Sequence, residues 1–85
     1  MEPRIYKDLN DIQKQLNTYG KYYPLKNSII TKNGIKIEVD IFPINGGYSF
    51  SVHDPDNGFY MPDKNNKLET ITLEELNKIK SVGKK

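Results

Sequence analysis

The sequence predicts an α+β fold with an N-terminal helix, a three- to four-stranded antiparallel β-meander and a short C-terminal helix. Three observations predict it: an apolar stripe at helical spacing near the N-terminus, apolar and polar residues in alternation through the middle, and a helix capping box near the C-terminus. A chain of 85 residues has room for one small domain, which we place at residues 1–80. Residues 81–85 are expected to form a basic, flexible tail.

The N-terminal helix is predicted by apolar residues at steps of three and four, which share one helical face. These residues are Ile5, Leu9, Ile12, Leu16 and Tyr19. Pro3 suits a first helical turn, and Gly20 stands where a left-handed C-terminal cap is expected. A later start is also open, with Asp8 as the N-cap and Asp11 in the third helical position.

The first hairpin follows a connector at residues 21–27, where Pro24 disfavours helix. Asn33-Gly34 is a strong hairpin signal, and it separates a strand at residues 28–32 from one at residues 35–42. In the second of these strands apolar residues face one way, and the residues facing the other way are Lys36, Glu38 and Asp40. This alternation is typical of a sheet with one face in solvent.

The second hairpin turns at Asn45-Gly46-Gly47 and leads to a third strand of alternating residues. A two-residue loop at Asn45-Gly46 would pair Ile41 with Phe50, whereas a loop one residue later would pair Ile41 with Val52. Both registers keep apolar residues opposite apolar residues, because they differ by two positions and preserve the face.

The C-terminal part begins with a turn and a possible fourth strand at residues 59–61, which Pro62 would end. A polar loop at residues 63–67 follows. Thr72 and Glu75 then form a capping box, with Thr72 at the N-cap. The helix that they begin has a short apolar stripe, made of Leu73, Leu76 and Ile79.

Composition excludes several function classes. The absence of cysteine removes disulfides, thiol catalysis and cysteine-based zinc sites, and a single histidine leaves no pair of histidines for a metal centre. The chain is too short for a dinucleotide-binding fold. The N-terminus carries charges instead of the apolar run of a signal peptide, so we expect a cytoplasmic protein. We expect no cofactor and no metal.

Charge differs between segments of the chain. The basic residues are twelve lysines and one arginine, and the net charge is +2. Residues 28–62, the predicted sheet, have a net charge of −2, while residues 1–27 and 63–85 have +2 each. A sheet that serves as a platform for nucleic acid should be basic, so direct nucleic-acid binding is the less favoured expectation.

His53 is the one candidate catalytic residue. It lies at a strand end on the same face as Ser49 and Ser51, and the tighter register places it opposite Glu38. A histidine with a carboxylate partner can act as a general base. A surface ion pair across the strands explains the same pattern and is the interpretation we favour, since no defined nucleophile stands beside His53.

Three other patterns have a structural explanation beside a functional one. The acidic turn at residues 54–58 resembles a calcium loop, but an Asx-type turn accounts for it. The lysines near the C-terminus suit the negative end of a helix dipole. A tyrosine cluster near the end of the first helix could stack bases or present an interface, or part of it could close the core; its members are Tyr19, Tyr22 and Tyr23, flanked by Lys21 and Lys26.

The element order resembles that of small ribonuclease toxins of bacterial toxin–antitoxin systems, in particular the HicA type. That family carries a Gly-Ser/Asp-His motif on an early strand. Here Phe50-Ser51-Val52-His53 lacks the glycine, so the family motif is not matched. The resemblance implies a ribonuclease that uses His53.

We expect a small non-catalytic module that binds a protein partner and inhibits or regulates it, as phage-encoded host inhibitors, anti-CRISPR proteins and immunity proteins do. The partner would be a nucleic-acid-binding enzyme, because carboxylates can occupy a basic groove. The contact would be a free sheet edge or an acidic sheet face with neighbouring tyrosines, comprising Glu38, Asp40, Asp54, Asp56, Tyr22 and Tyr23. Two alternatives stay open: a small ribonuclease or RNA-binding protein that uses His53, and a self-associating structural protein, for instance a homodimer.

Overall fold

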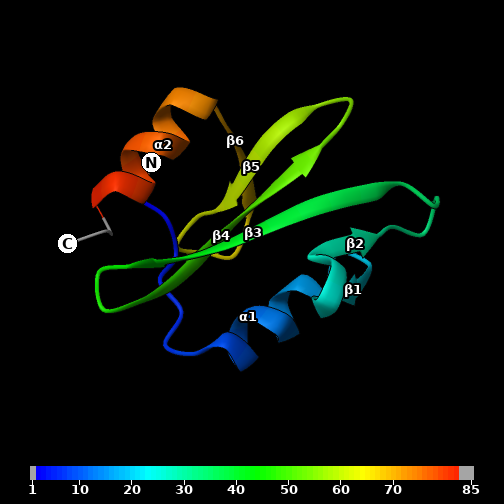
Figure 1. Ribbon diagram of the computed structural model, residues 1–85, viewed down its shortest axis with the longest axis horizontal. Coiled ribbons are helices and arrows are strands. Elements are labelled where there is room, and N and C mark those ends of the chain that lie inside the picture. The colour runs from blue at the N-terminus through cyan, green and yellow to red at the C-terminus, as the bar shows by residue number, and fades with distance from the viewer. Residues whose placement is uncertain (1, 83–85) are drawn as a thin grey trace.

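The computed structural model describes residues 2–82 and shows a six-stranded antiparallel sheet between two helices (Figure 1). The elements in chain order are α1 (Leu9–Leu16), β1 (Lys21–Tyr23), a short 3-10 helix (Pro24–Lys26), β2 (Ser28–Ile30), β3 (Lys36–Ile44), β4 (Gly47–Asp54), β5 (Gly58–Pro62), β6 (Leu68–Ile71) and α2 (Leu73–Val82). Each strand pairs with the next one along the chain, so the sheet order is β1-β2-β3-β4-β5-β6. The α+β prediction with helices near both ends is confirmed.

The predicted count of three to four strands is wrong, because the sheet has six. Strand β5 corresponds to the possible fourth strand. The two missed strands are β1, inside the expected connector, and β6, after the polar loop; they have three and four residues. Segments this short carry little alternation, and their strand conformation depends on pairing with β2 and β5.

The later start of α1 is the one observed. The Asp8 carboxylate accepts a hydrogen bond of 3.0 Å from the backbone N–H of Asp11 and so caps the helix. The C-cap is Asn17, so the expected cap at Gly20 is wrong. Gly20 serves a close approach instead, since a Cβ there would lie 2.6 Å from the carbonyl oxygen of Ile30.

The β3–β4 hairpin has the tighter of the two predicted registers. Ile41 pairs with Phe50 and Glu38 pairs with His53. The turn residues Asn45 and Gly46 both have positive φ, at 47° and 83°, as a two-residue turn of this kind requires.

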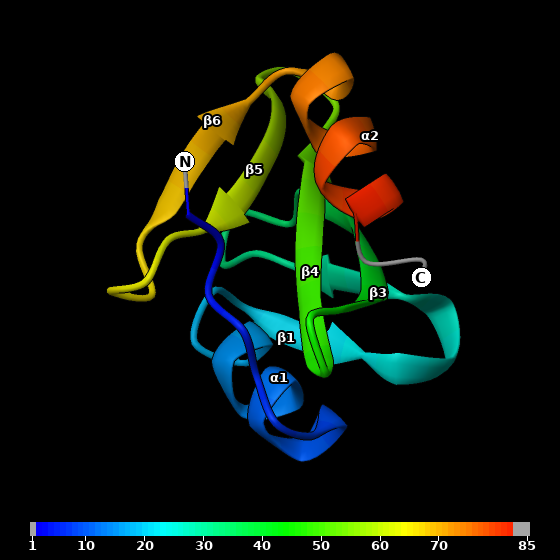
Figure 2. The same ribbon diagram turned by 90° about the vertical axis from the view of Figure 1, so that its left-hand side faces the viewer.

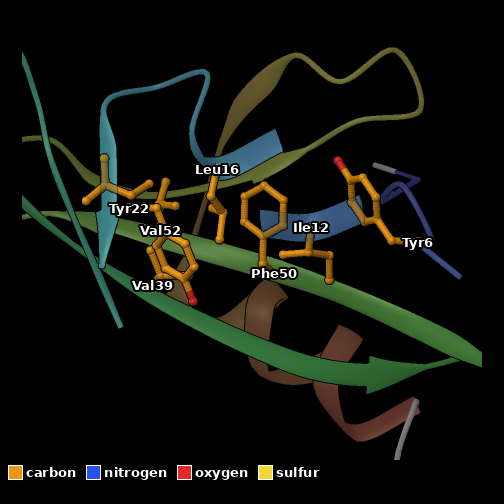
Figure 3. Packing of buried hydrophobic residues seen from close by; sticks show 8 residues of the cluster. Tyr6, Ile12, Leu16, Tyr22, Val39, Phe50 and Val52 are labelled. Atoms are coloured by element: carbon orange, nitrogen blue, oxygen red, sulfur yellow. The ribbon is translucent and has the colours of Figure 1, made fainter. Parts of the chain in front are cut away.

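Two hydrophobic clusters lie on the two faces of this hairpin (Figures 1 and 2). The larger one packs beneath α1, with Phe50 fully buried against Ile12 and Leu16 (Figure 3). The smaller one packs beneath α2 and contains Phe42, Ile44, Met61, Ile71 and Leu76. The expectation of one solvent face is therefore corrected, because α2 covers part of it.

The N-terminal segment lies between β4 and β5 where these two strands no longer pair with each other, and it forms backbone hydrogen bonds to both. Tyr6 and Tyr48 form an antiparallel bridge with two backbone hydrogen bonds of 2.8 Å each. The backbone N–H of Arg4 donates to the carbonyl of Pro62 at 3.0 Å. This segment thereby ties β4 to β5 by contacts far apart in the sequence.

The predicted N-cap at Thr72 is confirmed, because the backbone N–H of Glu75 donates to Oγ1 of Thr72 at 3.1 Å, which is one of the two hydrogen bonds of a capping box. Helix α2 continues through Ser81 and Val82, which were expected in the tail. Residues 83–85 of that tail lie outside the described residues. Among the described residues, neither helix is long and apolar enough to cross a membrane.

Candidate functional site

One transverse row of side chains crosses all six strands on the face that α2 partly covers. Directly paired residues of an antiparallel sheet share a face, so the strand registers define this row. Its members, from β1 to β6, are Tyr23, Ser28, Glu38, His53, Phe59 and Ile71. The row brings the expected His53–Glu38 pair next to α2.

A groove with a volume of about 220 Å³ lies between this row and α2. We call it the α2 groove. On the sheet side it is lined by Glu38, Asp40, Ser51, His53 and Phe59, and on the helix side by Leu73, Leu76, Asn77 and Lys80. Its apolar part comes from Phe59 and the two leucines, so the groove combines an apolar lining with charged residues.

The charged residues of the α2 groove are two carboxylates and one ammonium group. Asp40 and Lys80 form an ion pair that joins β3 to α2, and the Asp40 side chain is still 52% exposed. Lys80 also lies over the Phe42 ring, with Nζ 5.6 Å from the ring centroid. Glu38 is exposed and stands two residues from Asp40 on the same face of β3. The groove is therefore acidic overall.

His53 packs against an aromatic ring instead of pairing with Glu38. Its ring stacks on Phe59, with centroids 4.4 Å apart and an interplanar angle of 24°. Although His53 and Glu38 are register partners, they form no ion pair among the described residues. Neither the expected surface ion pair nor a histidine–carboxylate catalytic pair is thus present in this arrangement.

Asp54, the last residue of β4, and Asp56, in the turn between β4 and β5, do not line the α2 groove. The Asp54 carboxylate accepts a hydrogen bond of 2.9 Å from the backbone N–H of Asp56 and one of 3.1 Å from the Asn57 side chain. The backbone hydrogen bond from Asp56, helped by the Asn57 side chain, holds the pKa of Asp54 below its usual value. This is an Asx-type turn, and within residues 2–82 no three acidic or histidine side chains gather to hold a metal ion.

The tyrosine cluster is divided between the core and the surface. Tyr22 is only 7% exposed and belongs to the cluster under α1, where burial raises its pKa. Tyr19 packs against the same cluster. Tyr23 points to the opposite face, is 37% exposed and lies under the Lys21 ammonium group, 5.4 Å from the ring centroid. Of the two tyrosines expected at a partner contact, Tyr23 has the exposed ring.

Sequence reasoning missed the helix side of the groove. Phe42 and Ile44 are the signal that could have revealed it, because they share the face of Lys36, Glu38 and Asp40 yet are apolar. Their presence required a cover over that half of the face, and α2 provides it.

No family model, curated protein or solved structure matches this chain. The resemblance to HicA-type toxins rested on element order with three to four strands, and the sheet has six.

Proposed function

We propose that this protein is a non-catalytic binding module that docks a basic segment of a protein partner in the α2 groove. The single observation that carries the proposal is the pair of neighbouring carboxylates, Glu38 and Asp40, at the exposed edge of a partly apolar groove. A groove of this kind offers an apolar lining for contact area and negative charge for orientation.

The nature of the partner follows from the charge. Basic grooves and basic segments are typical of enzymes that bind nucleic acids, and carboxylates can occupy such surfaces. We therefore propose an inhibitor or regulator of a nucleic-acid-binding enzyme, the role that phage-encoded host inhibitors, anti-CRISPR proteins and immunity proteins have.

The ribonuclease alternative is less well supported by the geometry. His53 stacks on Phe59, and the groove is lined by two carboxylates against one ammonium group, so its net negative charge repels a phosphate backbone. Ser51, the hydroxyl in this groove, is 3% exposed.

The test is a pull-down with the tagged protein from lysate, with and without nuclease treatment, with bound proteins identified by mass. Three variants are compared with the wild type: Glu38→Gln with Asp40→Asn, the matched control Asp56→Asn with Glu69→Gln, and His53→Ala. The control removes two exposed carboxylates outside the groove.

We expect one stoichiometric partner protein that stays bound after nuclease treatment. The control variant should retain it, whereas the amount bound to the groove variant should fall about tenfold or more, since paired charges contribute strongly at a desolvated contact. Equal retention by the groove and control variants would contradict docking in the groove. Degradation of added RNA by the wild type and its loss in His53→Ala would instead establish the ribonuclease.

A further inference from the structure

The half of the same sheet face that α2 leaves uncovered is basic. It is formed by β1, β2 and the start of β3, together with Lys26 of the 3-10 helix that joins β1 to β2, and we call it the lysine face. Its residues are Lys21, Tyr23, Lys26, Ser28, Ile30 and Lys36. Lys21, Ile30 and Lys36 form one row across the three strands, directly beside the row of Tyr23 and Ser28.

The charge of this half follows from an uninterrupted stretch of the sequence. Residues 12–37 contain five lysines and no acidic residue. The net charges of the longer segments do not reveal this stretch, because acidic residues precede it at positions 2, 8 and 11 and follow it from Glu38 onward. On the sheet face itself, Glu38 is the first carboxylate reached from the β1 edge. The lysine face and the α2 groove thus carry opposite charge on one face of one sheet.

A hollow of about 290 Å³ lies within the lysine face. It is lined by Tyr23, Ile30 and the buried Ser28, with the exposed lysines Lys26 and Lys36 also lining it. Tyr23 also borders a second, larger hollow on the edge of the sheet, where Lys21 and Lys32 lie. Tyr23 therefore lines both hollows, and each of them has two lysines in its lining.

We propose that the lysine face binds single-stranded nucleic acid. One base stacks on Tyr23 beside Ile30 in the smaller hollow. Lys26 and Lys36 contact the phosphates on one side of the ring, and Lys21 and Lys32 contact those on the other. An exposed aromatic ring among lysines is the arrangement that single strands use, because every base has a flat face and every linkage has a charge.

The observations favour a single strand over the other polyanions that lysines attract. A duplex keeps its bases stacked inside and would leave the Tyr23 ring unused. An acidic protein segment would meet the lysines but would gain nothing specific from a hollow bounded by an aromatic ring. The inference is independent of the α2 groove, whose carboxylates lie on the other half of the face.

The experiment is fluorescence anisotropy with a labelled uridine oligonucleotide about ten residues long, at low and moderate salt. Single-strand binding through about four phosphate contacts should weaken about 50-fold when salt rises from about 50 to about 200 mM. Lys26→Glu with Lys36→Glu should weaken binding at least tenfold. The matched control, Lys64→Glu with Lys78→Glu, makes the same charge change at exposed lysines elsewhere and should leave affinity within about threefold.

Two further measurements separate stacking from charge. Tyr23→Leu should weaken binding about fivefold or more, whereas Tyr23→Phe should keep it, because the flat ring carries the stacking energy. The proposal is overturned by any of three results: no binding at low salt, equal losses in the two lysine variants, or equal affinity for the oligonucleotide, a duplex of similar length and a poly-glutamate peptide. Retained circular dichroism and thermal unfolding show that each variant is folded.

Discussion

The backbone N–H of Tyr22 donates a hydrogen bond of 3.1 Å to the side-chain oxygen of Asn17. Tyr22 is the central residue of the edge strand β1, and Asn17 is the C-cap of α1. An unpaired N–H on an edge strand is what another strand uses to add to a sheet. The oxygen of the Asn17 side-chain amide accepts a hydrogen bond from that N–H, so this donor is not available to a strand that would add to the β1 edge.

We expect Asn17→Ala to lower the free energy of unfolding by about 1–2 kcal/mol, because it removes this hydrogen bond and the one that Asn17 donates to the Gln13 carbonyl at 3.0 Å. Urea denaturation measures the change. Asn10→Ala, at an exposed position in the first turn of α1, is the control and should not destabilise the protein. If the two variants unfold at the same urea concentration, Asn17 has no such role.

The core predicts a sharp difference between two leucines. Leu16 is fully buried beneath the sheet, whereas Leu25 is fully exposed in the short 3-10 helix. Leu16→Ala should cost about 2–5 kcal/mol, a large share of the stability of so small a domain, and Leu25→Ala less than about 0.5 kcal/mol. Thermal unfolding by circular dichroism compares them. A small effect of Leu16→Ala would contradict the packing of α1 on this face.

Gly47 lies where the N-terminal segment crosses β4. A Cβ there would stand 2.5 Å from the carbonyl oxygen of Tyr6, so Gly47→Ala must displace the Tyr6–Tyr48 bridge. We expect a loss of about 2 kcal/mol or more in the free energy of unfolding. Gly34→Ala is the comparison, because a Cβ there would meet no other atom. Its only cost is the strain of an alanine at a φ of 80°, about 1 kcal/mol in the free energy of unfolding. Equal losses of stability in the two variants would contradict a close contact between Gly47 and the N-terminal segment.

Tyr6 makes stability depend on pH in the alkaline range. Burial, with a contribution from the neighbouring Tyr19, raises the pKa of Tyr6 from 10.0 to about 12. The folded state therefore favours the neutral phenol, and this stabilisation is complete below pH 10 and lost as the pH rises toward 12.

We expect the free energy of unfolding of Tyr6→Phe to fall less steeply with rising pH than that of the wild type, measured by urea denaturation between pH 9 and 12. At neutral pH it should be about 1 kcal/mol less stable, because it lacks the hydrogen bond of 2.9 Å from the Tyr6 hydroxyl to the Asn66 side chain. Tyr23→Phe, at an exposed ring, controls for the removal of a phenol. Parallel pH profiles of wild type and Tyr6→Phe would contradict the prediction.

The hairpins could be predicted from the sequence because their signals are local. Asn45-Gly46 favours a turn, and strict alternation on both sides determines the faces, which are the same in both registers that the sequence left open. The structure selects the register that pairs Ile41 with Phe50 and Glu38 with His53. Strands β1 and β6 could not be recognised, because three or four residues show no period.

The candidate site was predictable only in part. Glu38, Asp40 and His53 were assigned to one face of adjacent strands, and they do line one groove. The position of α2 depends on long-range packing of Leu76 against Phe42, which no local pattern encodes. Asp54 and Asp56 were predicted on the same acidic sheet face as Glu38 and Asp40 because of their charge, but they do not line the α2 groove, and Asp54 holds the turn to β5 instead.

The central claim, docking in the α2 groove, is tested most directly by nuclear magnetic resonance of the isotopically labelled protein titrated with the partner captured in the pull-down. Our account predicts chemical-shift changes at Glu38, Asp40, Leu73 and Asn77, and their loss in the Glu38→Gln, Asp40→Asn variant. Changes confined to the β4–β5 turn or to the β6 edge, with the groove residues unmoved, would contradict it.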